Sequence, residues 1–344
     1  MILSSKSILV TGGAGFVGSR FVRHLIDTYP DSHVMVLDAL TYAGSMDNLP
    51  DQSNGGYEFW YGNVCNGDLV TTLVAEADIV VHFAAETHVT RSIYDNRLFF
   101  ETDVLGTQAI ANAVLKHADR IELLIHVSTS EVYGTAVTEQ MDESHPLNPM
   151  SPYAAAKCGA DRLIYSYGAT YDIPAVIVRP FNIFGPSQHL EKLIPRLVTS
   201  ALLNEPMTVH GDGSAARDYI YVADICRALD MIMQAPRDKV IGEVFNVCSG
   251  RHRSISSIAD DIIALMEASP RLKTNVLDRP GQVFRHTGDA SKIQRVLGWD
   301  SQWDWKDGLR ETIEWYGANR ETWEKQMWMR HVDITLPDGR TVTH

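Results

Sequence analysis

The chain has 344 residues and carries 30 basic against 43 acidic side chains, a formal net charge of −13. Its hydrophobic content of 45% is that of a globular protein, enough for one large domain or two coupled ones. No apolar run approaches the ~20 residues of a membrane span, and Met1 leads into a strand-like stretch without a signal-peptide pattern, so we expect a cytoplasmic protein with no membrane partner. The acidic balance also argues against a nucleic-acid partner. The four cysteines lack ligand spacing, which predicts reduced thiols and no metal: Cys65, Cys158, Cys226 and Cys248.

Strand-like and helical patterns alternate through the first half of the chain. Strands are predicted at Ser7–Thr11, His33–Leu37, Tyr57–Tyr61, Ile79–Phe83, Ile121–Ser128 and Ala175–Arg179. Helices are predicted at about Gly15–Thr28, Leu98–Lys116 and Ala154–Tyr171. This alternation predicts an α/β fold of Rossmann type, a doubly wound parallel sheet.

The second half has shorter segments, which predict a smaller mixed α+β region interleaved with the last elements of the sheet. Its strands are expected at Met207–His210, Arg217–Val222 and Val244–Val247. We expect a cofactor domain over residues 1–180, a substrate region over 181–330 and a tail over 331–344. Six of the seven tryptophans lie between Trp299 and Trp328, which predicts a terminal helix, roughly Lys306–Glu324, packed by aromatic rings. The tail, Asp333–Thr343, has Pro-Asp-Gly between alternating runs and predicts a hairpin.

A glycine-rich turn follows the first strand, in the run Thr11-Gly-Gly-Ala-Gly-Phe-Val-Gly18. Gly12 permits a tight turn, Gly15 lets the backbone approach a pyrophosphate, and Gly18 allows close packing of helix on strand. Asp38 closes the second strand, where a carboxylate accepts hydrogen bonds from ribose hydroxyls and repels a 2′-phosphate. The pattern predicts an NAD site rather than an NADP site.

A phenol and an ammonium lie one helical turn apart at Tyr153 and Lys157. A phenol acts as a base near neutral pH only when a cation stabilises its phenolate, and Lys157 can supply that charge. Such a pair is common on ordinary helices, so its position decides the interpretation. The run Ser128-Thr-Ser-Glu131 follows a buried strand at the sheet edge where doubly wound folds bind ligands.

These motifs together resemble the extended short-chain dehydrogenase/reductase superfamily. Within it, the chain resembles nucleotide-sugar 4,6-dehydratases of the dTDP-glucose type over nearly its whole length. The segments that carry the resemblance are Asp38–Gly44, His82–Val89, Glu191–Pro195, Arg217–Val222 and Asp278–Gly281.

The resemblance implies an NAD-dependent conversion of a nucleoside-diphosphate hexose to the 4-keto-6-deoxy sugar. The C4 hydroxyl is oxidised, water is lost across C5 and C6, and the hydride returns to C6. Tyr153 is then the first base, Lys157 its electrostatic support, Thr129 the group that polarises the C4 oxygen, and Glu131 the C5 base. A homodimer is also expected.

Further site residues follow from the same resemblance. For the cofactor they are Gly12, Gly15, Phe16, Val17, Gly18, Asp38, Leu40, Thr41, Asn63, Val64, Phe83, Ala84, Ala85, Thr102, Ser128, Tyr153 and Lys157. For the nucleotide sugar they are Thr87, His88, Thr129, Glu131, Asn182, Lys192, Leu193, Thr208, His210, Arg217, Asn246, Arg279 and Gln282. Arg217 is the expected diphosphate clamp.

The chain departs from the dTDP-glucose pattern at several positions. Ser130 stands where those enzymes have the aspartic acid that assists water loss, as in GDP-mannose 4,6-dehydratases, where glutamate can serve both steps. Serine at this place also occurs in UDP-glucuronic acid decarboxylases, so decarboxylation or 4-epimerisation is the alternative chemistry. A silent NAD-binding scaffold is a third interpretation, against which the intact catalytic set argues. Asn63, Asp103 and Gln282 replace a usual Asp, Asn and His.

Overall fold

A computed structural model describes residue 3 and residues 5–51, 55–277, 283–331, 333–335, 339 and 341–343. Its main feature is a seven-stranded sheet in the order β10-β6-β5-β4-β1-β2-β3, and all of its strand pairs are parallel. The strands are β1 (Ser7–Thr11), β2 (His33–Asp38), β3 (Glu58–Tyr61), β4 (Ile79–His82), β5 (Leu123–Val127), β6 (Ala175–Pro180) and β10 (Val244–Val247). The Rossmann-type fold class is therefore confirmed.

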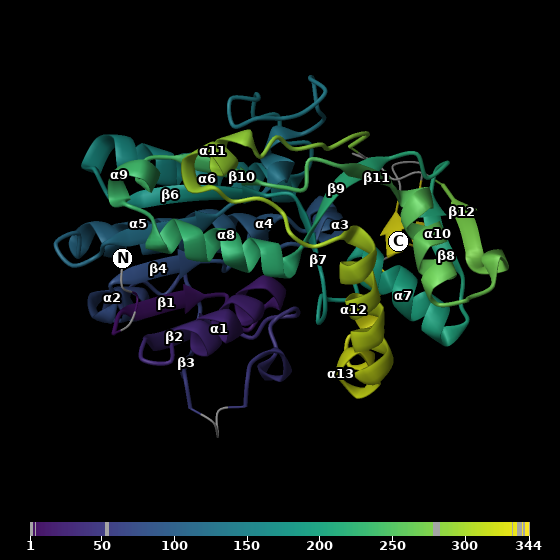
Figure 1. Ribbon diagram of the computed structural model, residues 1–344, viewed down its shortest axis with the longest axis horizontal. Helices are drawn as coiled ribbons and strands as arrows, with labels where there is room; N and C mark the ends of the chain where they lie inside the picture. Colours follow the sequence, from purple (N-terminus) through teal and green to yellow (C-terminus); the bar gives the residue numbers. More distant parts are fainter. Residues whose placement is uncertain are drawn as a thin grey trace.

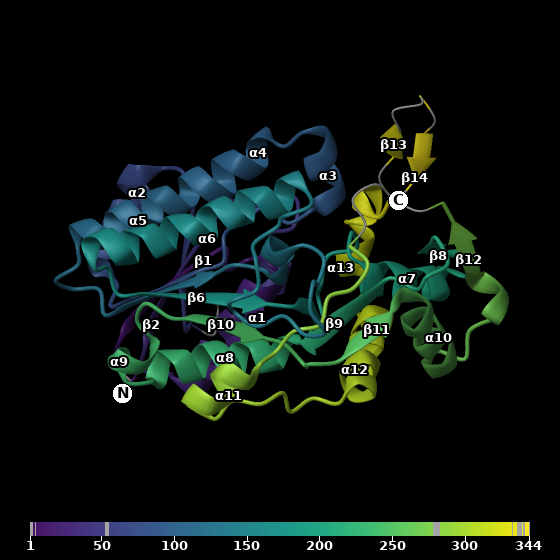
Figure 2. The ribbon, with the colours of Figure 1, turned by 90° about the horizontal axis from the view of Figure 1, so that it is seen from above.

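Helices cover both faces of this sheet, as Figures 1 and 2 show. One face carries α1 (Phe16–Thr28) and α8 (Val222–Gln234), and the other carries α2 (Gly67–Glu76), α5 (Thr107–Lys116) and α6 (Pro152–Tyr171). Two separate apolar clusters fill the spaces between sheet and helices. The central strands are mostly apolar because each is buried on both faces.

A smaller region lies beyond the carboxyl ends of the strands, on the right in Figure 1. Its sheets are β11-β9-β7 and β12-β8, from β7 (Asn182–Phe184), β8 (Met207–His210), β9 (Ala216–Tyr221), β11 (His252–Ser254) and β12 (Lys273–Val276). Its helices are α7 (Leu193–Leu203), α10 (Ile255–Leu265), α12 (Trp305–Ala318) and α13 (Arg320–Glu324). The remaining short helices are α3 (Val89–Tyr94), α4 (Arg97–Phe99), α9 (Arg237–Val240) and α11 (Ser291–Leu297).

The two regions share the chain in an interleaved way. Strand β10 belongs to the second half of the sequence, yet it pairs with β6 and completes the large sheet. Helix α8 also returns to that sheet, and packs against α1. Two segments after the boundary expected at residue 180, α8 and β10, therefore belong to the cofactor region.

Two expected helices are divided in the structure. The helix expected at Leu98–Lys116 contains a π-helical segment, η3 (Phe100–Gly106), between α4 and α5. The expected terminal helix ends at Ala318 and restarts as α13, and it buries Trp305 and Trp323 but leaves Trp328 exposed. The expected tail hairpin lies partly outside the described residues, and its two strands, β13 (Asp333–Thr335) and β14 (Thr341–Thr343), pair antiparallel.

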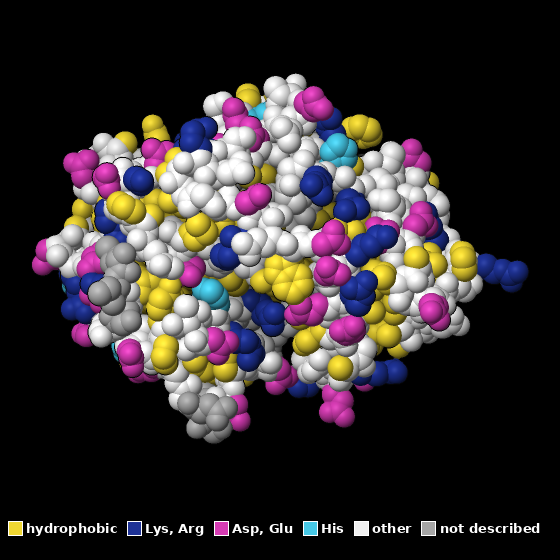
Figure 3. Space-filling model, in the orientation of Figure 1, with side chains coloured by type: hydrophobic (Ala, Val, Ile, Leu, Met, Phe, Trp, Pro, Cys, Tyr) yellow, Lys and Arg dark blue, Asp and Glu magenta, His cyan; other side chains and the backbone are white. Residues whose placement is uncertain are grey.

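Charged side chains of both signs are intermingled over the face shown in Figure 3. Within the described part of the chain, no helix combines the length and the apolar character needed to cross a membrane. The four cysteines are free thiols. No cluster of possible metal ligands occurs among the described residues.

Candidate active site

A cavity of about 440 Å³ lies at the carboxyl ends of the strands and brings most of the predicted site residues together. Its lining includes the predicted residues Gly12, Gly15, Phe16, Val17, Gly18, Asp38, Thr41, Asn63, Val64, Phe83, Ala84, Ala85, Thr87, His88, Thr102, Ser128, Thr129, Glu131, Tyr153, Lys157, Asn182, Lys192, Leu193, His210 and Arg217. Leu40, Ser130, Thr208 and Asn246 are described but do not line it. Arg279 and Gln282 lie outside the described residues.

The glycine turn joins β1 to α1 and has no room for side chains at two of its positions. Gly12 has φ +70°, and a Cβ there would lie 2.6 Å from the backbone nitrogen of Ala84. A Cβ on Gly18 would lie 2.2 Å from the carbonyl oxygen of Gly12. Gly15 is the N-cap of α1 and makes no side-chain cap, so the helix N-terminus faces the cavity with unsatisfied N–H groups.

Asp38 closes β2 at the rim of the same cavity. Its carboxylate accepts hydrogen bonds from the backbone nitrogens of Ala14 (2.9 Å) and Leu40 (2.8 Å). Burial raises its pKa, and these two N–H groups act in the opposite direction. The carboxylate is thus fixed in orientation by the glycine turn on one side and by the loop after β2 on the other. Leu40 contributes this backbone contact rather than a side chain in the cavity.

Tyr153 and Lys157 lie on one face of α6, which begins with Ser151 as N-cap and Pro152 in its first turn. Both side chains are buried and line the cavity. The Lys157 ammonium donates to the carbonyl oxygen of Val127 (2.9 Å) at the end of β5. The side chain of Thr129 is hydrogen-bonded to the Tyr153 hydroxyl. The predicted phenol, ammonium and hydroxyl therefore line one cavity.

Burial and nearby charges set the pKa of Tyr153. Burial is the largest influence and raises the pKa of the phenol, the negative charge of Asp103 raises it further, and the bond to Thr129 lowers it. Lys157 is buried too, and its pKa is lowered, because burial outweighs the opposing influence of Asp103 and Asp161. Burial and the neighbouring carboxylates thus keep the pKa of the phenol raised, and electrostatic support by Lys157 stays a prediction.

Asp103, from the π-helical segment η3, is the carboxylate that faces this pair. It is 1% exposed, and one of its oxygens accepts from the backbone nitrogen of Glu86 (2.7 Å) while the other has no hydrogen-bond partner among the described atoms. Burial raises its pKa to about 7, against the opposing charge of Lys157. The sequence identified Asp103 as unusual but gave no indication of this contact.

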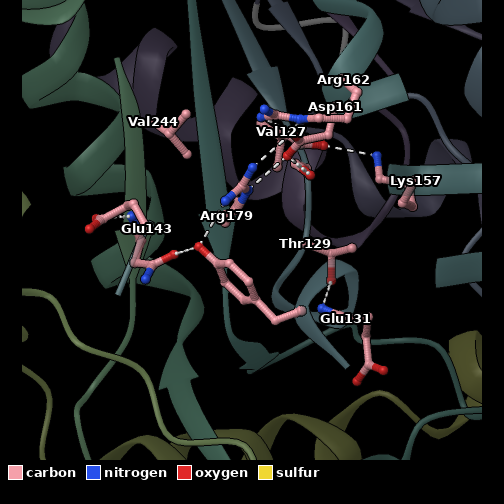
Figure 4. Close-up of polar contacts among 12 residues, drawn as sticks. Val127, Thr129, Glu131, Glu143, Lys157, Asp161, Arg162, Arg179 and Val244 are labelled. Atoms are coloured by element: carbon pink, nitrogen blue, oxygen red, sulfur yellow. Dashed lines mark hydrogen bonds and ion pairs between the residues drawn. The ribbon is translucent and has the colours of Figure 1, made fainter. Parts of the chain in front are cut away.

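A buried polar cluster lies beside the strand ends, and Figure 4 shows its contacts. Arg179 donates to Asp161 from Nε (2.8 Å) and Nη2 (2.9 Å), and Ser128 donates to the same carboxylate (2.7 Å). Tyr133 links Arg179 to Asn246, whose amide is fully buried and also donates to the carbonyl oxygen of Met141 (3.0 Å). Asn246 therefore supports the site from behind instead of lining it, which corrects its expected place.

Glu131 points away from this cluster in Figure 4 and lines the cavity. It belongs to a short 3-10 helix, η4 (Ser130–Tyr133), capped by Thr129, whose hydroxyl accepts from the Glu131 backbone nitrogen (3.2 Å). Ser130 precedes it, is 2% exposed and does not line the cavity. Thr208 also lies outside the lining, on β8.

The same cavity holds a polar cluster centred on Glu191, whose charge also acts on Tyr153 and which was not among the predicted site residues. Its carboxylate accepts from Lys192 (2.9 Å), Tyr42 (3.2 Å) and Thr87 (3.4 Å), and His88 lies 3.6 Å from it. Burial acts to raise the pKa of Glu191, but Lys192 and the two neighbouring histidines lower it overall. Burial lowers the pKa of His88 to about 4. The partners come from three separate segments, so no local spacing signals them.

Positive side chains also line the cavity. Arg217, on β9, is 6% exposed, and its Nη1 donates to the carbonyl oxygen of Ala216 (2.9 Å). Lys192 donates to the carbonyl oxygen of Thr87 (2.6 Å), and Arg196 also lines the cavity. His210 and Asn182 line the cavity too. The cavity lining thus includes a helix N-terminus and several cationic side chains.

Comparisons with known proteins agree with this arrangement. A family model described as GDP-mannose 4,6 dehydratase matches residues 9–312. The low-salt glycan biosynthesis protein Agl12 of Haloferax volcanii is 45% identical over 315 residues, covering 91% of this chain and 99% of the relative. The dTDP-glucose 4,6-dehydratase of Streptomyces niveus is 41% identical over 322 residues, covering 92% of this chain and 94% of the relative.

A solved structure supports the same relationship. DesIV, a dTDP-glucose 4,6-dehydratase from Streptomyces venezuelae solved with NAD bound, superposes with a TM-score of 0.89 at 38% identity, covering 93% of this chain and 99% of that one. The likeness thus includes both regions and the cavity between them. The chain belongs to the GDP-mannose 4,6-dehydratase family, within the extended short-chain dehydrogenases/reductases.

Proposed function

We propose that this protein is an NAD-dependent nucleotide-sugar 4,6-dehydratase, which converts a nucleoside-diphosphate hexose to its 4-keto-6-deoxy derivative. The observation that carries the proposal is the convergence of Thr129, Glu131, Tyr153 and Lys157 in one cavity with the glycine turn. Family membership and the names of the dehydratase relatives support it.

The residues present fit a dinucleotide. The backbone at Gly12 lies too close to Ala84 for any side chain, which leaves a smooth cradle, and the N-terminus of α1 offers N–H groups to a pyrophosphate. Asp38 holds two oxygens at the rim, where ribose hydroxyls can donate to them. NAD, when bound, would accept a hydride from the sugar and later return it.

The chain's own residues would perform the proton transfers. Tyr153 removes the proton of the C4 hydroxyl while Thr129 hydrogen-bonds the same oxygen, and Lys157 supplies positive charge near both. Glu131 removes the C5 proton once the C4 ketone has acidified it. Because Ser130 does not line the cavity, Glu131 also returns a proton to the departing C6 hydroxyl.

The cluster around Glu191 and Arg217 would hold the nucleotide sugar. Oε2 of Glu191 and Nε2 of His88 face each other at 3.6 Å, and neither has a hydrogen-bond partner among the described atoms, an arrangement that fits a ligand rich in hydroxyls. Arg217, Lys192 and Arg196 offer positive charge to a diphosphate. These side chains would attract an anionic ligand although the net charge of the chain is −13.

A panel of dTDP-, UDP- and GDP-hexoses, with UDP-glucuronic acid included, tests the proposal by product mass. Loss of one water with deuterium from solvent at C5 is the expected result. Release of carbon dioxide would identify a decarboxylase, and inversion at C4 without a change of mass would identify an epimerase. Either outcome as the sole activity overturns the dehydratase assignment.

We also propose a cytoplasmic homodimer that pairs through η3 and α6. Exposed apolar side chains on these elements support it, including Phe100 (42%), Leu105 (52%) and Tyr165 (54%). Light scattering after size exclusion tests the stoichiometry. Leu105→Glu together with Tyr165→Glu is expected to give a monomer, and an unchanged dimer would exclude this surface.

A further inference from the structure

His286 lies directly behind Glu131 and has no role in the scheme above. Its backbone is fixed because residues 284–286 pair with β9: Ala216 donates to the carbonyl oxygen of Phe284 (2.9 Å), and His286 donates to the carbonyl oxygen of Ala216 (3.1 Å). The imidazole is fully buried and meets the ring of Phe181 edge-on at 6.1 Å. Its position is therefore set independently of any ligand.

The hydrogen bonds of the ring determine its tautomer. Nε2 lies within hydrogen-bond distance of the carbonyl oxygen of Gly134, which can only accept, so Nε2 carries a proton. Nδ1 has no hydrogen-bond partner among the described atoms and lies 3.9 Å from Oε1 of Glu131. A neutral His286 therefore presents a lone pair to the carboxyl group of Glu131.

The surroundings favour that neutral form. Burial lowers the pKa of His286, the positive charge of Arg217 and the nearby His145 lower it further, and Glu131 and the Gly134 carbonyl act in the opposite direction. A lone pair and an ionised carboxylate cannot hydrogen-bond each other, in agreement with their separation of 3.9 Å. A protonated Glu131 can donate to the same nitrogen.

We propose that His286 is a positioning residue for Glu131, whose Nδ1 accepts a hydrogen bond from the Glu131 carboxylic acid formed when the C5 proton is taken. The bond stabilises the protonated acid and fixes its orientation until it gives that proton to the C6 hydroxyl, which leaves as water. One proton leaves C5 and one reaches the departing oxygen, so Glu131 and His286 both end unchanged. The inference rests on the proposed dehydratase function.

Two variants test the roles of the two ring nitrogens of His286 separately. In His286→Gln the longer amide reaches the Gly134 carbonyl but leaves no acceptor at the position of Nδ1, whereas in His286→Asn the shorter amide places a polar atom near Nδ1. The matched control is His252→Gln, because His252 is exposed on β11 and bonds Thr287 (2.8 Å) without lining the cavity.

The experiment is a rapid-quench single turnover with dTDP-glucose, or with whichever sugar nucleotide of the panel the wild-type chain dehydrates. Mass spectrometry separates the 4-keto hexose, lighter than substrate by two hydrogens, from the 4-keto-6-deoxy product. We expect His286→Gln to oxidise C4 at a rate within about twofold of wild type but to form the deoxy product roughly 10- to 100-fold more slowly, the loss of one hydrogen bond to a reacting group. The 4-keto hexose then accumulates.

Further readouts distinguish positioning from a structural role. His286→Asn should recover part of the elimination rate, and His252→Gln should match wild type. Without the acceptor for protonated Glu131, the acidic limb of the elimination rate in His286→Gln should move to lower pH. Equal slowing of oxidation and elimination, or a wild-type elimination rate, in His286→Gln overturns the inference. Absence of dehydration by the wild-type chain overturns the proposed function instead.

Discussion

Asp161 and Arg179 form a buried ion pair near the cavity, and we expect this pair to contribute to the stability of the folded protein. Their side chains are 0% and 2% exposed and are joined by two hydrogen bonds. Asp161→Asn leaves Arg179 buried without a counter-charge, so we expect the free energy of unfolding at pH 7 to fall by roughly 3 kcal/mol. Urea unfolding measures it. Asp307→Asn, at an exposed pair with Arg310, should change it by less than about 1 kcal/mol.

The ion pair of Asp161 and Arg179 also predicts how the stability of the protein depends on pH. Burial acts to raise the pKa of Asp161, but Arg179, Arg162 and Ser128 lower it to about 2. A depressed pKa gives stability that is present above the unfolded value of 3.8 and is lost as the pH falls from about 4 toward 2. We expect Asp161→Asn to lack this part of the acid dependence. Identical slopes of stability against pH for wild type and variant below pH 4 would contradict the prediction.

Asp38 predicts a change of cofactor preference. Asp38→Asn removes the negative charge at the cavity rim, so NAD should bind roughly tenfold more weakly while repulsion of a 2′-phosphate is relieved. Calorimetric titration with NAD and with NADP gives the ratio of the two affinities. Damage to the loop would weaken both cofactors alike, so an unchanged ratio would contradict an electrostatic role for Asp38.

The sequence motifs placed residues in the cavity where local structure fixes the direction of the side chain, and could not do so where packing decides it. Gly12, Asp38 and Glu131 lie at or after strand ends, Tyr153 lies in the first turn of α6, and all four line the cavity. Asn246 has a strand position but turns toward Tyr133. Residue spacing along one strand cannot show a choice that depends on packing between distant segments.

At the scale of elements, the glycine turn couples β1 to α1 through close backbone contact. Gly18→Ala places a Cβ 2.2 Å from the Gly12 carbonyl oxygen, where only movement of the helix relieves the clash. We expect a loss of about 1–3 kcal/mol and weaker NAD binding. Gly317→Ala, in α12 with nothing within 4 Å of the new Cβ, should gain about 0.5–1 kcal/mol. Thermal unfolding with and without NAD compares the two, and a Gly18→Ala variant as stable as wild type would contradict the prediction.

Strands that are buried on both faces were predicted well from their apolar residues, and the π-helical segment was not predicted. Both faces of β1, β4 and β5 are buried, so their apolar runs identify them. The π-helical segment at Phe100–Gly106 has only 7 residues, too few for its different number of residues per turn to show in the apolar pattern of the sequence. This is the segment that presents Asp103 to Lys157.

At the scale of the whole molecule, the large sheet requires chain from both halves of the sequence. One apolar cluster joins residues of β1, β2 and α1 to Phe245 and Val247 of β10, to Leu229 and Ile232 of α8, and to Trp299. A fragment of residues 1–180 would leave β6 as an open edge and expose the sheet face that α8 covers. Motifs of the cofactor site suggest a boundary near residue 180, but this packing argues that the fragment is not an independent folding unit.

We therefore expect residues 1–180 alone to unfold without a cooperative thermal transition and to lack NAD binding, although they contain the glycine turn and Tyr153. The control is a chain ending at residue 331, which removes β13 and β14 but keeps the bond from Arg330 to Glu205 (2.6 Å). That chain should unfold cooperatively and retain dehydratase activity, because neither tail strand belongs to the large sheet. Circular dichroism in the near and far ultraviolet follows both chains. A sigmoidal transition with NAD-dependent stabilisation of the 1–180 fragment would show that α8 and β10 are dispensable, and would place the folding unit at the boundary that the sequence motifs suggest.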